Sequence, residues 1–160
     1  MFEYTICFIR KGEKILMLNR DFPEWMGVWN GVGGKIDANE TPLECILREV
    51  REETGINLEN IEYKGNVTWT DGSTYFGSMY VFIAELLESY QYNTPIKVDE
   101  GILDWKDISW ILHPSNLGIA DIQHYLPNML NEAVNYEYKF TYKKNKLIEF
   151  TAIPLDVAFK

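Results

Sequence analysis

Short apolar runs separated by turn residues dominate the chain, a pattern typical of strands joined by tight connections. We expect strands over Tyr4–Ile9, Ile15–Leu18, Ile61–Thr70, Tyr75–Leu87, Ile102–Asp107, Tyr138–Tyr142 and Leu147–Phe150. Turns are expected at Lys11–Glu13, Asp71–Ser73 and Lys143–Lys146. The stretch from Trp29 to Ile36 is dense in glycine, and its scarcity of side chains favours a role for the backbone over helix packing.

The segment after this glycine-rich stretch carries a complete set of helix signals. Thr41 is a capping residue, Pro42 suits the first helical position, and Glu44 completes a capping box three residues after the cap. Gly55 supplies a left-handed stop, so the sequence predicts a helix over 42–54. The expected buried stripe of this helix consists of Leu43, Ile46, Leu47 and Val50.

A second amphipathic helix is expected over Asp121–Asn135, although Pro127 disturbs its start. The residues expected on its inner face are Tyr125, Leu130 and Val134. Strands outnumber helices, and the helices separate groups of strands. This order predicts one α/β domain over residues 1–160, in which a mixed β-sheet is sandwiched between helices as an α/β/α sandwich.

Composition and charge narrow the classes of partner. The 160 residues carry 15 Lys and Arg against 24 Asp and Glu, a formal net charge of −9, which argues against duplex nucleic acid and anionic membranes. A polyanionic ligand would need a local site or a cation. No apolar run approaches the roughly 18 residues of a membrane span. Because Met1–Tyr4 lacks the basic start of a signal peptide, we expect a cytoplasmic protein, with Cys7 and Cys45 as reduced thiols.

Three glutamates on the predicted helix share one face. Glu49, Glu52 and Glu53 are spaced i, i+3 and i+4, which places their carboxylates within an arc of about 100°. Like charges at this spacing repel one another and destabilise the helix. Hard divalent cations such as Mg²⁺ bind carboxylate oxygens, and a cation would offset this repulsion. The alternative is a solvated acidic face.

These glutamates belong to a longer pattern of 23 residues, which resembles the signature of the Nudix hydrolases. The matching pattern is Gly34-x5-Glu40-x7-Arg48-Glu49-Val50-x-Glu52-Glu53-x-Gly55-Ile56. By average residue usage, such a match would arise by chance in on the order of one chain in ten million. The resemblance implies the Nudix fold and the hydrolysis of a nucleoside diphosphate linked to another group. It also implies Mg²⁺ as the cofactor, with Mn²⁺ as a substitute.

The resemblance further implies roles for individual acidic residues. In that family the matching glutamates bind the divalent cations, so Glu49 and Glu53 are expected as principal ligands. Glu52 is expected as a third ligand or as the base that deprotonates water. Glu100 lies where family members place an additional acid near the metals, and the alternative for it is a loop carboxylate.

Backbone and loop residues of the pattern have physical roles as well. The Gly33–Gly34 backbone can approach a metal or a phosphate closely because no Cβ intervenes, and the Gly34 carbonyl could be a ligand. Arg48 directly precedes the first acid of the cluster, so it points to a different sector of the helix. From there it could bond Glu40 and pin the loop to the helix, the alternative being a surface ion pair.

The substrate is suggested by residues outside the metal-binding glutamates. The stretch Trp29-Asn30-Gly31-x-Gly33-Gly34-Lys35 resembles the corresponding part of the MutT-type oxidised purine nucleoside triphosphatases. In that subfamily the residue matching Asn30 hydrogen-bonds the purine, and the alternative is a turn-forming Asn. Lys35 and Arg20 are assigned to substrate binding with it. Arg20 matches a basic residue beside the pocket, and its alternative is a solvated surface side chain.

The run Ile119–Pro127 aligns with the start of the last helix of these enzymes, where two aspartates read the purine and a tryptophan stacks on it. Asp121 matches the first aspartate, but Ile122 replaces the second and Ile119 replaces the tryptophan. Asp121 could equally be a helix N-cap. Among the tryptophans, Trp69 is favoured for a base pocket, with core packing as its alternative.

Together these features predict a Mg²⁺-dependent pyrophosphohydrolase. Its expected substrate is a nucleoside triphosphate, above all an oxidised purine such as 8-oxo-dGTP, cleaved to the monophosphate and pyrophosphate. One alternative is a hydrolase of another nucleoside diphosphate derivative, such as a dinucleotide or a nucleotide sugar. Another is a nucleotide-sensing module that keeps the fold without turnover. The oligomeric state is left open.

Overall fold

The computed structural model of the chain describes residues 2–21, 27–72, 76–131, 133–144 and 146–155. Its strands are β1 (Tyr4–Lys11), β2 (Lys14–Arg20), β3 (Trp29–Asn30), β4 (Val32–Lys35), β5 (Ile61–Thr70), β6 (Phe76–Glu85), β7 (Ile96–Val98), β8 (Gly101–Asp107), β9 (Tyr136–Lys143) and β10 (Lys146–Pro154). Its helices are α1 (Pro42–Thr54), α2 (Ile108–Ile111), the 3₁₀ helix η2 (Ile122–His124) and α3 (Leu126–Asn131).

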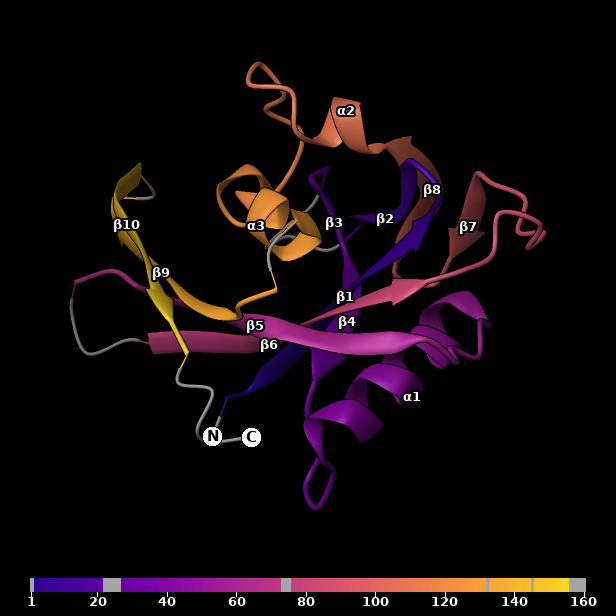
Figure 1. Ribbon diagram of the computed structural model, residues 1–160, viewed down its shortest axis with the longest axis horizontal. Coiled ribbons are helices and arrows are strands. Elements are labelled where there is room, and N and C mark those ends of the chain that lie inside the picture. Colours follow the sequence, from indigo (N-terminus) through magenta and orange to yellow (C-terminus); the bar gives the residue numbers. More distant parts are fainter. Residues whose placement is uncertain (1, 22–26, 73–75, 132, 145, 156–160) are drawn as a thin grey trace.

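The described strands join in one mixed sheet. The main order is β10-β9-β5-β6-β1-β2-β8-β7, while β3 pairs with β2 and β4 pairs with β1 off this path. β1 runs parallel to β6, and β5 runs parallel to β9. Helix α1 covers one face of the sheet, and α3 lies on the other side (Figure 1). The predicted mixed sheet between helices is confirmed.

Side chains that alternate along the central strands build a core on each face. On β1, Ile6 and Phe8 join the hydrophobic cluster that includes α3, whereas Cys7 and Ile9 join the cluster that includes α1. Both faces of these strands are therefore covered, which gives them nearly continuous apolar sequences. This continuity is why the sequence located the central strands well.

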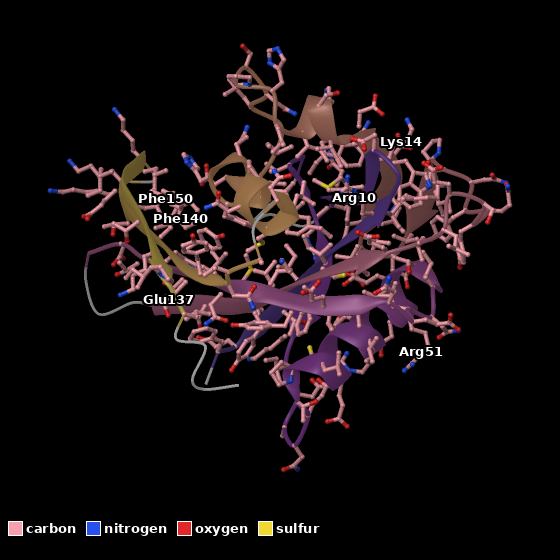
Figure 2. All side chains as sticks on the ribbon, in the orientation of Figure 1. Arg10, Lys14, Arg51, Glu137, Phe140 and Phe150 are labelled. Atoms are coloured by element: carbon pink, nitrogen blue, oxygen red, sulfur yellow. The ribbon has the colours of Figure 1, made fainter. Side chains whose placement is uncertain are left out.

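The C-terminal hairpin of β9 and β10 closes the α3 side of the core. Phe140 packs there as a buried side chain, and Phe150 lies 4.9 Å from it between ring centroids (Figure 2). The ring of His124 lies against both, at 5.7 Å and 5.2 Å. The hairpin is thus fixed to the segment that carries η2 and α3.

Helix α1 forms at the residues that the sequence signals predict, and its capping box is present. Thr41 Oγ1 accepts a hydrogen bond from the Glu44 backbone N–H at 3.1 Å, and Glu44 Oε1 accepts one from the Thr41 backbone N–H at 2.9 Å. Gly55 ends the helix with φ 79°, a left-handed conformation that glycine adopts without steric cost. Local sequence therefore determines both ends of α1.

The buried face of α1 differs from the prediction at its two ends and at Leu47, which is only partly buried. Leu43, expected in the buried stripe, is 46% exposed, and burial begins only at Cys45, whose thiol contacts Thr5 of β1. At the other end Glu53 is buried, because it lies three residues after Val50 on the same side of the helix. The face of α1 that packs on the sheet thus includes one buried carboxylate, that of Glu53.

The helix predicted over Asp121–Asn135 is wrong in extent. Asp121 has φ 24°, outside the right-handed helical region, and Pro127 has no N–H to continue a hydrogen-bond ladder. The segment divides into η2 and the six-residue α3 as a result. Tyr125 is buried as expected, whereas Val134, expected on the inner face, is 42% exposed beyond the end of α3.

Several short elements were not expected from the sequence. The glycine-rich stretch folds as β3 and β4, and β7 and α2 also lack a distinct sequence signal. The close pairing of β4 with β1 explains the glycines, since a Cβ on Gly33 would lie 2.1 Å from the carbonyl oxygen of Thr5. Ser73 and Asn145 of two predicted turns, and Tyr75 of a predicted strand, lie outside the described residues.

The two cysteines are free and buried, as expected for reduced thiols. Within the described ranges, no helix combines the length and apolarity that crossing a membrane requires.

Replacing Gly33 by alanine should destabilise the fold, because its Cβ would collide with backbone atoms of β1 that cannot move away without breaking the sheet pairing. We expect Gly33→Ala to lower the free energy of unfolding by roughly 1–3 kcal/mol. Urea titration followed by circular dichroism measures this change. Gly118→Ala is the control, since its Cβ would meet only Asn116 Oδ1 at 3.5 Å. Equal unfolding midpoints for the two variants would contradict the argument.

Candidate active site

Arg48 fixes the loop before α1 to the helix. Its Nε donates to Glu40 Oε2 at 2.6 Å and its Nη2 donates to Glu40 Oε1 at 2.9 Å, a two-bond pairing of guanidinium and carboxylate. Nη2 also donates to the backbone carbonyl of Lys35 at 3.2 Å. The guanidinium lowers the pKa of Glu40 to about 2. The contact that the sequence suggested between Arg48 and Glu40 is therefore present, and it anchors residues 35–40.

The same guanidinium also contacts the acidic face of α1. Arg48 Nη1 donates to Glu49 Oε1 at 2.9 Å and to Glu52 Oε2 at 3.3 Å. Its position one residue before Glu49 suggested that Arg48 points to a different sector of the helix. That expectation is wrong, because the guanidinium reaches the acidic face. The side chain of Glu52 is 58% exposed, whereas that of Glu49 is 16% exposed. One positive charge thus offsets part of the repulsion between these carboxylates.

Glu53 occupies the most enclosed position of the three glutamates. Its side chain is 5% exposed, and Oε2 is a buried oxygen that has no hydrogen-bond partner in the described part of the chain. The nearest cation is Arg20, whose Nη2 lies 4.0 Å from that oxygen. Burial raises the pKa of Glu53 to about 8, against the opposing charge of Arg20, and the carboxylates of Glu49 and Glu100 add to the increase.

The absence of a side chain at Gly34 leaves room for the carboxylate of Glu49. A Cβ on Gly34 would lie 2.6 Å from the carboxyl carbon of Glu49, so only glycine leaves room for this approach. The Gly34 carbonyl accepts two long side-chain hydrogen bonds, from Thr5 Oγ1 at 3.4 Å and from Cys45 Sγ at 3.9 Å. Strand β4, which holds Gly34 beside β1, therefore lies directly against the acidic face of α1.

These residues suit a hard divalent cation. Carboxylate and carbonyl oxygens are the ligands that Mg²⁺ takes in proteins, and the unpartnered Oε2 of Glu53 is a buried acceptor that a cation would satisfy. In the described ranges, no three His, Cys, Asp or Glu side chains already converge as a complete ligand group. Arg48 holds two of the glutamates, so these would turn from the guanidinium toward the ion.

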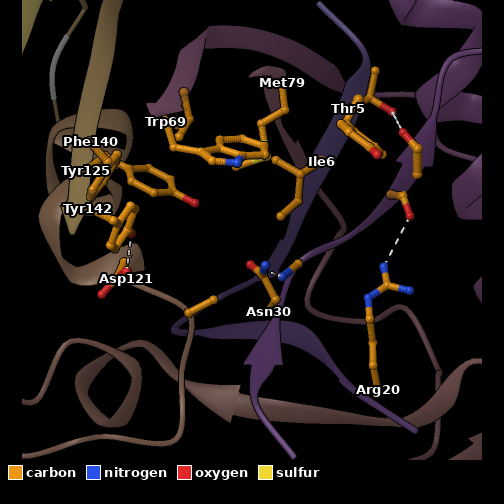
Figure 3. A pocket seen from close by; sticks show the side chains of 16 residues that line it. Thr5, Ile6, Arg20, Asn30, Trp69, Met79, Asp121, Tyr125, Phe140 and Tyr142 are labelled. Carbon is orange, nitrogen blue, oxygen red and sulfur yellow. Dashed lines mark hydrogen bonds between the residues drawn. The ribbon is translucent and has the colours of Figure 1, made fainter. Parts of the chain in front are cut away.

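Figure 3 shows a cavity of about 620 Å³ whose lining includes Arg20 and Gly34. Because Arg20 faces Glu53 and Gly34 lies against Glu49, the cavity borders the acidic cluster. Its described lining consists of Tyr4, Thr5, Ile6, Arg20, Asn30, Gly31, Gly33, Gly34, Val67, Trp69, Met79, Ala120, Asp121, Tyr125, Phe140 and Tyr142. Arg20 connects the two regions, since its Nη2 donates to the Gly33 carbonyl at 3.2 Å while facing Glu53. An elongated ligand could therefore occupy the cavity and reach the acidic cluster at once.

Backbone pairing brings the polar groups of the cavity together. Trp29 forms a parallel bridge with Ile119: its N–H donates to the Gly118 carbonyl at 2.7 Å, and its carbonyl accepts from Ala120 at 3.1 Å. Asn30 directly follows Trp29, and Asp121 comes two residues after Ile119. Both residues line the cavity. Contacts between segments far apart in sequence therefore assemble this end of the site.

The predicted site residues fall into three groups. Gly34, Glu49, Glu53 and Arg20 gather at the junction of β4, β2 and α1, and Glu100 is within electrostatic range of Glu53. Asn30 and Asp121 lie in the cavity. The exposed Lys35 side chain does not line it, and Lys35 borders instead a separate surface hollow with Glu40.

Aromatic residues of the cavity were largely missed by the sequence analysis. Trp69, the tryptophan favoured for a base pocket, does line the cavity. Gly77, its partner on β6, leaves room for the indole. Phe140 lies across from Trp69 because β9 pairs in parallel with β5, and Tyr142 follows two residues later. Nothing local in the sequence indicates that parallel pairing. The aromatic wall that the replacement of a tryptophan by Ile119 seemed to remove is supplied by these residues.

Comparison with known proteins agrees with this geometry. The family model of the NUDIX domain matches residues 3–123, so the chain belongs to the Nudix family, and it is a Nudix hydrolase of the pyrophosphohydrolase kind. Members of this family generally use divalent metals such as Mg²⁺. The family membership expected from the 23-residue pattern is confirmed.

Individual relatives extend the likeness over most of the chain. The Nudix hydrolase YvcI of Bacillus subtilis is 29% identical over 144 residues, which cover 85% of this chain and 87% of that protein. The crystal structure of the mutator protein MutT of Bacillus halodurans has a TM-score of 0.76 and 26% identity, covering 95% of this chain and 97% of that one. The NAD-capped RNA hydrolase NudC of Pseudomonas aeruginosa is 34% identical over 65 residues, only 40% of this chain and 23% of that protein.

Raising the pH should weaken the metal-free protein through Glu53. Because its pKa is about 8 in the fold, the native state keeps a proton that the unfolded chain releases near the ordinary carboxyl pKa of about 4.3. This contribution to stability is fully present below that ordinary pKa and is lost as the pH rises through about 8. The glutamine side chain of Glu53→Gln is neutral at every pH. At about pH 9 the variant should therefore have a higher melting temperature than the wild type, and at about pH 5 the difference in melting temperature should be smaller.

Calorimetric melting in the presence of a chelator measures this difference. Glu59→Gln is the matched control, because Glu59 is an exposed carboxylate in the segment after α1. A difference in melting temperature between Glu53→Gln and wild type that does not change with pH would show that the buried carboxyl does not titrate as argued.

Proposed function

We propose that this Nudix hydrolase is a Mg²⁺-dependent enzyme that cleaves a purine nucleoside triphosphate, above all an oxidised purine such as 8-oxo-dGTP, to the nucleoside monophosphate and pyrophosphate. The observation that carries the proposal is the continuity between the aromatic cavity and the acidic cluster through Arg20 and Gly33. A planar base in the cavity leaves its phosphates near Glu49 and Glu53. The likeness to the mutator protein MutT of Bacillus halodurans agrees with the MutT-type resemblance of the stretch Trp29–Lys35.

Each acidic residue has a proposed task in this reaction. Glu49 and Glu53 hold the cation together with the Gly34 carbonyl, and Glu100 adds a further carboxylate nearby. Glu52 is the third ligand or accepts the proton of the attacking water, and its exposed side chain is free to turn toward either task. When bound, Mg²⁺ offsets phosphate charge and lowers the pKa of a water molecule.

The remaining residues bind and orient the substrate. Arg20 lies between the cavity and the acidic cluster, so its guanidinium is suited to a phosphate oxygen. Asn30 and Asp121 offer polar contacts to the base edge. Arg48 and Glu40 act by holding the loop before α1 against the helix. Lys35 stays a predicted substrate contact that would act from outside the cavity.

A second candidate is the hydrolysis of another nucleoside diphosphate derivative. The named activity of the Pseudomonas aeruginosa NudC, on NAD-capped RNA, favours it. The Shewanella oneidensis NrtR NUDIX domain, a structural neighbour, was crystallised with ADP ribose. The NudC match, however, covers only 40% of this chain, and the NrtR match at 20% identity supports the fold alone. Both are therefore weaker guides to the substrate than the cavity itself.

The purified protein should release pyrophosphate from a purine nucleoside triphosphate when Mg²⁺ is present. The measurement is a panel of 8-oxo-dGTP, dGTP, dATP, dCTP, dTTP, NAD and ADP-ribose, with products separated by chromatography. Chelation of the cation should stop the reaction, and Mn²⁺ should restore it. Turnover of NAD or ADP-ribose alone would favour the second candidate, and release of no pyrophosphate from any triphosphate would reject the proposed substrate.

Removing the charge of Glu53 should slow the reaction without preventing folding. Glu53→Gln takes away one ligand oxygen and the only buried side-chain oxygen left unpartnered in the described residues, so we expect kcat to fall by about 10²–10⁴-fold. Calorimetric titration should also show weaker Mg²⁺ binding. Glu59→Gln should keep both properties of the wild type. Full activity of Glu53→Gln would exclude the proposed role of Glu53 and leave the other glutamates to be tested.

A further inference from the structure

A tyrosine from the C-terminal hairpin reaches the carboxylate that lies in the cavity. The hydroxyl of Tyr142 on β9 donates a hydrogen bond to Asp121 Oδ2, and Figure 3 shows the two side chains pointing toward each other at the end of the cavity away from Arg20. Burial and the neighbouring carboxylate raise the pKa of Tyr142 well above its usual value, so the phenol keeps its proton near neutral pH. The tyrosine is therefore a permanent donor to Asp121.

The backbone of Asp121 is held as firmly as its side chain. Its φ of 24° lies in the left-handed region, which L-residues adopt rarely and aspartate tolerates better than most. The preceding Ala120 is bonded to the carbonyl of Trp29, and the carbonyl of Asp121 accepts from His124 N–H at 3.4 Å. The Asp121 side chain makes no capping bond to η2. Asp121 thus stands at the N-cap position of η2 without capping it, and its carboxylate lies in the cavity instead.

Asn30 provides the complementary donor. Its Oδ1 accepts the backbone N–H of Gly31 at 2.8 Å, which identifies the other atom of the amide as Nδ2. Within the described residues, Nδ2 has no acceptor, so its hydrogens are available to a ligand. Figure 3 shows Asn30 between Asp121 and Arg20. The cavity therefore presents a carboxylate acceptor and a neutral donor to a ligand that lies against its aromatic side chains.

We propose that Tyr142 is a positioning residue for base selection: its hydroxyl orients the Asp121 carboxylate to receive a base edge that carries two adjacent N–H donors, as guanine-type bases do. This inference rests on the proposed function. A carboxylate has about four acceptor positions, and the bond from Tyr142 occupies one, which leaves acceptors on both oxygens for a paired contact. An adenine edge presents a ring-nitrogen lone pair beside its single amino donor, and that lone pair would face the negative oxygen.

The hydroxyl can be removed without removing the wall. The ring of Tyr142 stacks on Phe140 with an interplanar angle of 9° and 6.2 Å between centroids, so phenylalanine at 142 keeps the packing surface. What changes is the orientation of Asp121, which loses its donor. A residue that served only packing would affect all bases alike, whereas a residue that orients the carboxylate affects guanine-type bases selectively.

The test compares Tyr142→Phe with the wild type in steady-state hydrolysis of dGTP, 8-oxo-dGTP and dATP with Mg²⁺. We expect KM for the two guanine-type nucleotides to rise about tenfold, with kcat and the KM for dATP close to wild type, because a base contact contributes equally to substrate and transition state. Tyr136→Phe is the matched control: it lies on the same strand outside the cavity lining and should change neither parameter.

The variant Asp121→Asn tests whether the carboxylate of Asp121 carries the preference for guanine-type bases. It also replaces Tyr142→Phe in the test if that variant folds poorly. It should lose the same preference, and adding Tyr142→Phe to it should have no further effect, as expected for two residues that act as one unit. Additive effects in the double variant, or equal losses for guanine and adenine nucleotides, would overturn the proposal.

Binding of dGMP and dAMP, measured by calorimetry without any turnover, separates this inference from the proposed function. If no triphosphate is hydrolysed, the proposed function fails, yet a preference for dGMP that Tyr142→Phe removes would still support the role of Tyr142. If the wild type binds dGMP no more tightly than dAMP, the role of Tyr142 in base selection is rejected even when hydrolysis is observed.

Discussion

A carboxylate on the buried stripe of a helix is the constraint around which this molecule is arranged. Glu53 follows Ile46 and Val50 at helical spacing, so the packing that stabilises α1 against the sheet also withdraws this side chain from water. A buried carboxylate without a hydrogen-bond partner destabilises the folded state, and Arg20 at 4.0 Å offsets this only in part. Binding a proton or a cation at Glu53 therefore stabilises the folded state, because it neutralises this buried charge.

Two arginines divide the work of holding the acidic residues. Arg48 forms a two-bond pairing with Glu40 and reaches Glu49, so it fixes the loop and the outer part of the cluster. Arg20 faces the inner part and also bonds the backbone of Gly33 at the edge of the cavity. The cluster thus has a fixed outer border and an inner border shared with the ligand space. This division suits a reaction in which phosphates arrive from the cavity side.

The cavity depends on contacts between distant segments. Parallel pairing of β9 with β5 sets Phe140 across from Trp69, and the bridge between Trp29 and Ile119 aligns the segment before Asp121 with β3. Neither contact adds charge or chemistry by itself. Each one places side chains in the lining of the cavity, so the packing of the C-terminal third onto the sheet decides the shape of that cavity.

The sequence alone determined the features that depend on near neighbours. The capping box and Gly55 defined α1, and apolar runs located the central strands. The spacing of Glu49, Glu52 and Glu53 identified the acidic face, and the 23-residue pattern that contains them identified the family. Short-range hydrogen bonds and helical periodicity act within a few residues, so a linear pattern records them.

Only the tertiary structure decided which of these residues meet. It showed that Glu53 is buried while Glu52 is exposed, and that Lys35 does not line the cavity. It also showed that the Asp121 carboxylate pairs with Tyr142 instead of capping η2. Such contacts come from strand pairing across tens of residues, and the free energy of that pairing depends on the whole core. No local pattern of residues carries that information.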